Sequence, residues 1–307
     1  MKILFRADSS STIGTGHIMR DLVLAKKYAK KDHNIIFATQ DLSGNINHKI
    51  LEDGYKLVIL KSNSLKELDA QIKKLDIDML VVDHYRIDYK FEKKLKIQNP
   101  KLKILSFDDT YEKHYCDILL NHNISADKTK YKVLVPNRCV LRCGAKYTLL
   151  RDEFFKEKKK QKKKLKIKNS TFKIFVAMGG ADTANLNIKI LKELKKIKNI
   201  KVNLVTTTAN QHLDLLEKYT KKKSWINLQV NSNKVAKLMA KSDFAIVTPS
   251  VTVNEVYYME LAFIAIKTAD NQEDMYKFLK SKGYLVLSRF DKIKFQNHIS
   301  KMLRNLQ

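Results

Sequence analysis

The chain has 307 residues, a formal net charge of +28 at pH 7 and a hydrophobic fraction of 44%. This length allows two domains with separate cores, and the hydrophobic fraction is ordinary for a globular protein. No apolar run approaches the ~20 residues that span a bilayer, and Arg6 and Asp8 interrupt the only apolar stretch near the N-terminus. We therefore expect no transmembrane segment, no signal peptide and a cytoplasmic protein.

The basic excess is mostly lysine, spread over nearly every predicted helix. Proteins that read bases and phosphates rely on the bidentate fork of arginine, which is scarce here. The one dense run, Lys156 to Lys168, is typical of a solvated linker. We expect no specific nucleic-acid partner, although nonspecific attraction to phosphate is expected at low salt.

The cysteines Cys116, Cys139 and Cys143 cannot all pair, which suits a reducing compartment. Their spacings match no strong zinc pattern, so we interpret them as structural or incidental thiols. The sequence predicts neither a metal nor a cofactor.

In chain order, the first feature is a strand, a glycine-rich turn and a helix. Apolar residues 3–5 predict a buried strand, and the apolar spacing from Ile18 onward predicts a helix. Between them, Gly14 and Gly16 allow the backbone to approach a ligand closely. His17 stands at the helix start, where it is either a proton acceptor or only a capping or solvated residue.

Further strands are predicted at 34–38, 56–60, 79–82, 103–107 and 118–120, and a helix at 64–75 with Ser64 as its N-cap. Polar clusters follow three of these strands: 83–85, Asp108-Asp109 and 121–123. Alternating strands and helices indicate an α/β fold with a parallel, doubly wound sheet. Because ligands bind beyond the carboxyl ends of such strands, this edge is the expected site.

The second half repeats the pattern, with strands predicted at 172–178, 202–205, 225–230, 244–247 and 263–266. We place a first Rossmann-like domain at 1–155, a lysine-rich linker at 156–170 and a second Rossmann-like domain at 171–307. The last helix could return to the first domain. A cleft between two such domains is a natural place for a nucleotide-linked substrate.

These features resemble the GT-B fold of nucleotide-sugar enzymes and, more narrowly, the UDP-sugar hydrolase family of pseudaminic acid biosynthesis. The matching motifs extend from residue 3 to about residue 285. They are 9–21, 83–85, 106–109, 116–121, 142–144, 150–154, 178–182, 253–255 and 271–272.

The resemblance implies hydrolysis of a UDP-linked 2,4-diacetamido-2,4,6-trideoxy-L-altrose to UDP and the free sugar, in a pathway that serves flagellin glycosylation. The second half would bind UDP, with Glu255 holding the ribose hydroxyls and Gly179-Gly180 presenting backbone N–H groups to the diphosphate. Without the resemblance, Glu255 could equally be a first-turn helix acid and the glycines a plain tight turn. The remaining substrate-binding candidates are Gly14, Thr15, Gly16, Arg20, Asn123, Arg151, Ser250, Val253, Asn254, Asn271 and Gln272.

By the same resemblance, His17 would be the general base that activates water, through an oxocarbenium-like state. Helix N-termini would hold the diphosphate charge, making a metal unnecessary. Tyr85 either orients the water, His17 or the sugar, or forms an aromatic wall. Asp108-Asp109 is a further candidate, although adjacent acids at a strand end also cap turns.

Two rival functions remain open. A GT-B glycosyltransferase would use the same donor with an acceptor other than water, and a basic nucleic-acid-binding module would need charge gathered on one face. We expect the UDP-sugar and water as partners, and a monomer.

Overall fold

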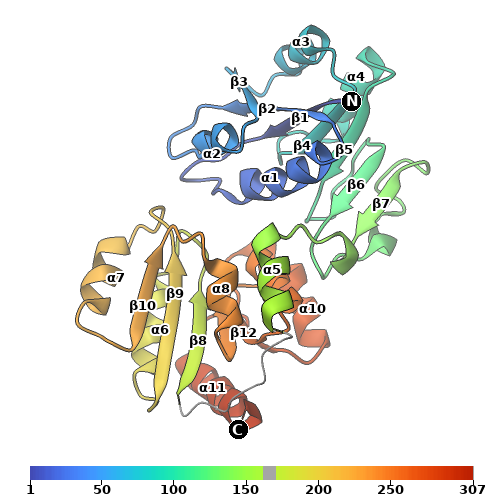
Figure 1. Cartoon of the computed structure of the whole chain (residues 1–307). Coiled ribbons are helices and arrows are strands. Elements are labelled where there is room, and N and C mark those ends of the chain that lie inside the picture. The colour runs from blue at the N-terminus through green and yellow to red at the C-terminus, as the bar shows by residue number, and fades with distance from the viewer. Residues whose placement is uncertain (162–170, 307) are drawn as a thin grey trace. The chain divides into compact units, whose positions relative to one another are not determined.

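The structure is a computed structural model that describes residues 1–161 and 171–306. The chain divides into two compact units, Met1–Leu149 and Leu150–Gln307 (Figure 1). Each is an α/β unit built on one parallel sheet.

The first unit contains a seven-stranded sheet in the order β3-β2-β1-β4-β5-β6-β7. All its pairings are parallel, and the apolar runs of its central strands are buried on both faces, as parallel sheets require. The short β7 was not predicted. The strands are β1 (Lys2–Ala7), β2 (Asn34–Gln40), β3 (Lys56–Leu60), β4 (Met79–Asp83), β5 (Lys103–Phe107), β6 (Ile118–Asn121) and β7 (Val140–Cys143).

Helices cover both faces of this sheet. One face packs against α1 (Gly16–Ala29) and α2 (Asn47–Glu52), through Ile18, Leu22 and Ile50 among others. The opposite face packs against α3 (Leu65–Leu75) and α4 (Tyr89–Gln98). Ser64 is the N-cap of α3 and accepts a hydrogen bond from the N–H of Glu67, as predicted. Two 3₁₀ turns, Lys128–Tyr131 and Ala145–Tyr147, flank β7.

The second unit contains a six-stranded parallel sheet in the order β10-β9-β8-β11-β12-β13. Its elements are β8 (Phe172–Ala177), β9 (Ile200–Thr206), β10 (Ile226–Val230), β11 (Phe244–Val247), β12 (Ala262–Ile266), β13 (Leu285–Leu287), α5 (Asp152–Gln161), α6 (Leu186–Leu194), α7 (Leu213–Thr220), α8 (Val235–Ala240), α9 (Val251–Tyr258), a 3₁₀ turn (Asp270–Gln272), α10 (Glu273–Ser281) and α11 (Lys292–Leu306).

Two expectations about this unit need correction. The last helix, α11, was expected to be free to pack elsewhere but is part of the second unit: Phe295, Ile299 and Met302 are buried in the core formed with β8, β11 and α6. Residues 156–161 are not a linker but part of α5, which packs against α8. Phe154 and Lys158 are both buried, and the aliphatic part of the lysine side chain contributes apolar surface. The helix can therefore pack against the second unit although it has few apolar residues. The rest of the predicted linker, 162–170, lies outside the described residues.

Strand order places one topological switch point in each unit. In the first unit the chain moves from β1 outward to β2 and β3, and then crosses to β4 on the other side of β1. In the second unit the same reversal separates β8 from β11. Ligands bind beyond the carboxyl ends of the strands at such points. The turns after β1, β4, β8 and β11 are therefore the places to look for a site.

Candidate active site

The turn after β1 is held by its own serine and by a left-handed glycine. Ser10 Oγ accepts hydrogen bonds from the N–H groups of Thr12 and Ile13, and the N–H of Gly14 donates to the carbonyl of Ser10 at 2.8 Å. Gly14 has φ +84°, a conformation that side chains other than glycine rarely adopt. A Cβ at Gly14 or Gly16 would meet no atom within 4 Å, so the space beside the turn is open.

This turn delivers His17 to the first turn of α1, next to the end of β4. Thr15 is the N-cap residue, and His17 is the second residue of the helix. The ring Nδ1 of His17 lies 2.6 Å from Oδ1 of Asp83, the last residue of β4. Both side chains are buried, at 8% and 2% exposure. Since an ionised carboxylate only accepts hydrogen bonds, the neutral tautomer that fits this contact has its proton on Nδ1 and its lone pair on Nε2.

Arg20, one helical turn after His17, keeps Asp83 ionised. Its guanidinium donates to both carboxylate oxygens of Asp83, with Nε 2.5 Å from Oδ2, and Nη1 donates to Oδ2 of Asp109 at 3.1 Å. The guanidinium carbon also lies 5.0 Å from the centre of the Phe107 ring. Burial alone would favour a protonated Asp83, but Arg20 and then His17 hold its pKa well below the ordinary value.

Tyr85 completes this group of side chains, which we call the His17 cluster: His17, Arg20, Asp83, Tyr85 and Asp109. The phenol donates to Oδ1 of Asp109 at 3.0 Å, and the ring meets the His17 ring edge to face at 5.1 Å. Much of the ring is exposed, but desolvation of the hydroxyl and the Asp109 charge raise the pKa of Tyr85. Tyr85 therefore remains a hydrogen-bond donor at neutral pH.

Two buried titratable groups near the cluster escaped the sequence reasoning. Both carboxylate oxygens of Asp21 and both ring nitrogens of His122 lack a hydrogen-bond partner among the described residues. Burial raises the pKa of Asp21 well above its usual range and lowers the pKa of His122 to about 3. His122 is thus neutral at pH 7, and burial favours the protonated form of Asp21. Asp21 ends the motif 9–21 and His122 belongs to the predicted polar cluster after β6, but neither was singled out as a site residue.

In the second unit, the structure brings together two predicted substrate-binding residues, Arg151 and Glu255. Arg151 Nη2 lies 3.3 Å from Oε1 of Glu255, and Nη1 lies 2.9 Å from Oε1 of Glu153. Burial raises the pKa of Glu255 to about 7, against the opposing effect of Arg151. Glu255 is therefore only partly ionised at neutral pH.

The turns after β8 and β11 carry the glycines and hydroxyls predicted to meet the diphosphate. Gly179 has φ +81°, and a Cβ on Gly180 would lie 2.9 Å from Oγ1 of Thr207. The carbonyl of Gly180 accepts hydrogen bonds from the hydroxyls of Thr206 and Thr207. Ser250 is the N-cap of α9, and its hydroxyl lies 2.9 Å from that of Thr248. These turns follow the carboxyl ends of β8 and β11, where the diphosphate contacts are predicted.

The other predicted binding residues differ in how accessible they are. Val253 is fully buried, so its side chain packs in the core, and its N–H donates to the carbonyl of Ser250. Asn254 is also buried, whereas Asn271 is exposed. Gln272 accepts a hydrogen bond from the N–H of Thr268 at 2.8 Å. Asn123 is half-buried, and its N–H donates to Oδ1 of Asn121.

In residues 1–161 and 171–306, no group of three or more His, Cys, Asp or Glu side chains is arranged to hold a metal ion. The three cysteines are free thiols. Over the same described ranges, every helix is too short or too polar to cross a bilayer.

Comparison with known structures defines the class. MurG from Acinetobacter baumannii superposes with a TM-score of 0.67 at 13% identity, covering 99% of this chain and 92% of its own. The spinosyn rhamnosyltransferase SpnG gives a TM-score of 0.67 at 11% identity with the same coverage. The protein has the GT-B fold, as predicted.

Comparison of sequences defines the family. No protein-family model matches the chain. The chain is 41% identical over 286 residues to the UDP-2,4-diacetamido-2,4,6-trideoxy-beta-L-altropyranose hydrolase of Campylobacter jejuni subsp. jejuni serotype O:2, covering 93% of this chain and 98% of that protein. The chain therefore belongs to this family of hydrolases, and it is an enzyme.

Proposed function

We propose that the protein hydrolyses a UDP-linked 2,4-diacetamido-2,4,6-trideoxy-L-altrose to UDP and the free sugar, with His17 as general base. The observation that carries this proposal is the 2.6 Å contact between Asp83 and Nδ1 of His17 in a relative of a UDP-sugar hydrolase. A histidine whose Nδ1–H is committed to a buried carboxylate presents a basic Nε2, as in other histidine bases.

The chemical step is a displacement by water at the anomeric carbon. Nε2 of His17 takes one proton from water as the water oxygen bonds to the anomeric carbon. The bond from that carbon to the phosphate oxygen breaks, and UDP leaves with the electron pair. The resulting imidazolium is stabilised by Asp83, which Arg20 keeps ionised. A single displacement inverts the anomeric configuration, so the first-formed sugar is expected to have the opposite anomeric configuration.

The remaining residues of the cluster act around this step. Tyr85 lies against the His17 ring and donates a hydrogen bond to Asp109, so it orients the ring and helps to place water or sugar. Arg20 acts as a positioning residue, because its guanidinium is engaged by Asp83 and Asp109.

We assign UDP to the second unit. A carboxylate accepts two hydroxyl hydrogen bonds well, so ionised Glu255 would hold the ribose, with Arg151 as its charge partner. Gly179-Gly180 and the start of α9 would hold the diphosphate through backbone N–H groups. We further propose that the reaction is metal-independent and serves pseudaminic acid biosynthesis in the cytoplasm.

One experiment tests the proposal against its rivals. The purified protein is incubated with the UDP-sugar in water with no acceptor, and products are followed by NMR. Stoichiometric UDP and free sugar, with an inverted first-formed anomer, support the hydrolase. Turnover only after an acceptor is added would mean a glycosyltransferase, and no turnover under any condition would favour a binding module.

A further inference from the structure

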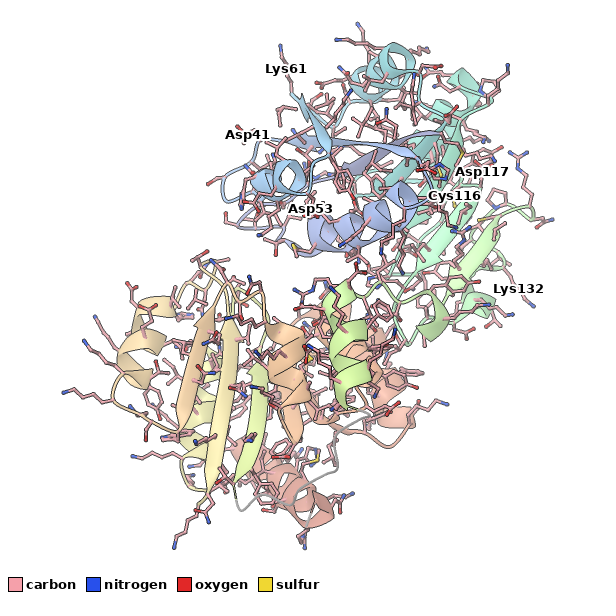
Figure 2. All side chains as sticks on the ribbon, in the orientation of Figure 1. Asp41, Asp53, Lys61, Cys116, Asp117 and Lys132 are labelled. Atoms are coloured by element: carbon pink, nitrogen blue, oxygen red, sulfur yellow. The ribbon has the colours of Figure 1, made fainter. Side chains whose placement is uncertain are left out.

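A large pocket in the first unit opens beside the His17 cluster. It has a volume of about 880 Å³, within the range of pockets that hold small organic ligands. Asp83 and Tyr85 of the cluster line it, together with Phe107, over which Arg20 lies. The lining segments fall within 83–90, 107–115 and 133–136. Figure 2 labels Cys116 and Lys132, which adjoin two of these segments in sequence.

The pocket has an apolar and aromatic wall. Leu134, Val135 and Pro136 contribute aliphatic surface, and the rings of Tyr89 and Tyr115 meet edge to face at 5.6 Å. The backbone N–H of His114 donates to the carbonyl of Leu134 at 2.9 Å, which ties two lining segments together. The wall is therefore built by packed segments and not by a single loop.

A charged pair lies behind one side of this pocket. Glu92, on α4, is fully buried, and its carboxylate accepts hydrogen bonds from Ser106 Oγ at 2.6 Å and from the N–H of Tyr115 at 2.5 Å. The same carboxylate lies 2.9 Å from Nδ1 of His114, which lines the pocket. A buried carboxylate requires a compensating positive charge or donors. Burial opposes charging of His114, but Glu92 prevails and raises its pKa.

This pair has no part in the water-activation step described above, yet it supplies a donor to the pocket. With Nδ1 committed to Glu92, Nε2 is the His114 nitrogen left for a ligand. The raised pKa of His114 favours the imidazolium, in which Nε2 donates. Other charged groups at the pocket are Asp88, Lys90, Asp108, Glu112 and Lys113. The three carboxylates are balanced by the two lysines and His114, so the lining shows no preference for a charged occupant of either sign. A neutral ligand with a strong acceptor and a methyl group fits better.

We infer that this pocket is the subsite for the sugar, and that His114, held by Glu92, is a positioning residue that donates to an N-acyl carbonyl while the aliphatic wall receives the acyl methyl. The inference deepens the proposed function and rests on it. It assigns recognition of an N-acylated, deoxygenated hexose to residues 83–90, 107–115 and 133–136. An amide carbonyl is a good partner for a charged donor, and the deoxy positions suit an apolar wall.

Calorimetry on a protein that cannot consume its ligand tests the inference. In a His17→Asn background, UDP and the UDP-linked diacetamido sugar are titrated with and without His114→Gln. We expect the UDP-sugar to bind more tightly than UDP, and His114→Gln to weaken UDP-sugar binding by about tenfold to hundredfold while UDP binding is unchanged. His48→Gln, on the exposed face of α2, is the matched control and should change neither affinity.

The outcomes separate this inference from the proposed function. Equal affinity of UDP and UDP-sugar in the His17→Asn protein, an equal loss for both ligands in His114→Gln, or no loss would each overturn the sugar subsite. If His114→Gln does not fold, Val133→Trp replaces it. Val133 is 83% exposed and lines the pocket, so a larger ring there should obstruct the sugar without disturbing the core. A wild-type protein that never hydrolyses the substrate would refute the proposed function. The UDP and UDP-sugar affinities, with and without His114→Gln, would still decide whether the pocket binds the sugar.

Discussion

Replacing Asp83 by Asn tests whether the carboxylate works through His17. The substitution keeps the size of the side chain but removes its charge and one acceptor. In the native protein Asp83 accepts from Nδ1 of His17 at 2.6 Å and from Arg20 on both oxygens. The amide group of Asn must point its NH₂ at either His17 or Arg20. If it faces His17, it donates to Nδ1 and moves the imidazole proton to Nε2, which then cannot take a proton from water.

The expected loss is large and falls on turnover. Loss of a general base, or of the group that sets its tautomer, typically costs ~10²–10⁴ in rate. We expect kcat to fall by that range with little change in KM, because the residues assigned to UDP lie in the second unit. The change also removes the main counter-charge of buried Arg20. Breaking a buried pair costs ~3–5 kcal/mol, here toward the lower end because Asp109 remains 3.1 Å away.

The assay is a double-mutant cycle in UDP release. Asp83→Asn, His17→Asn and the double variant are compared at a temperature where urea unfolding shows each to be folded. Residues that act as a unit are strongly non-additive, so the double variant should be no slower than His17→Asn alone. Asp76→Asn, whose carboxylate is 91% exposed and pairs only with Lys2 in the described contacts, is the control. Additive losses, or near-normal kcat in His17→Asn, would show that the base lies elsewhere.

Four further predictions concern the second unit and metals. Glu255→Ala should weaken UDP binding by ~1.5–3 kcal/mol in calorimetry, the worth of hydrogen bonds to a charged group, and unchanged affinity would exclude the ribose contact. Because the pKa of Glu255 is raised to about 7, the acceptor becomes ionised as pH rises, so UDP affinity relative to Glu255→Gln should increase by about tenfold between pH 6 and 8; a flat or falling ratio would contradict this. Gly180→Ala should also weaken UDP binding, since the new Cβ would lie 2.9 Å from Thr207 Oγ1 and displace the turn. Thr207→Ala in the same background removes that oxygen and should restore part of the binding if the contact is the cause. Activity should persist in excess EDTA, and a loss rescued by magnesium would refute the metal-independent mechanism.

Hydrophobic periodicity was enough to predict the α/β class and most strands. Continuous apolar runs such as 79–82 and 244–247 are buried on both faces of parallel sheets, and that burial is what makes them apolar throughout. The short β7 and β13 were missed because three or four residues carry too little pattern. The lysine-rich stretch up to Gln161 was predicted to be a linker, but it is helical, since Phe154 and Lys158 are buried and anchor a helix that composition alone marks as a linker.

The sequence also predicted a site at one edge of each sheet, because polar clusters follow the ends of parallel strands. The sequence could not show which of Asp83, His84 and Tyr85 contacts His17, because successive side chains at the end of a strand point in different directions. Pairing places Ala7 beside Asp83, and the alternation of side chains sends Asp83 to His17 while His84 contacts Asp8. The Glu92–His114 pair joins an α4 residue to a loop after β5 and has no local signature. Local physical chemistry determined the elements and the edge, but only tertiary packing decided which carboxylate meets which histidine, because that depends on distances between residues far apart in the chain.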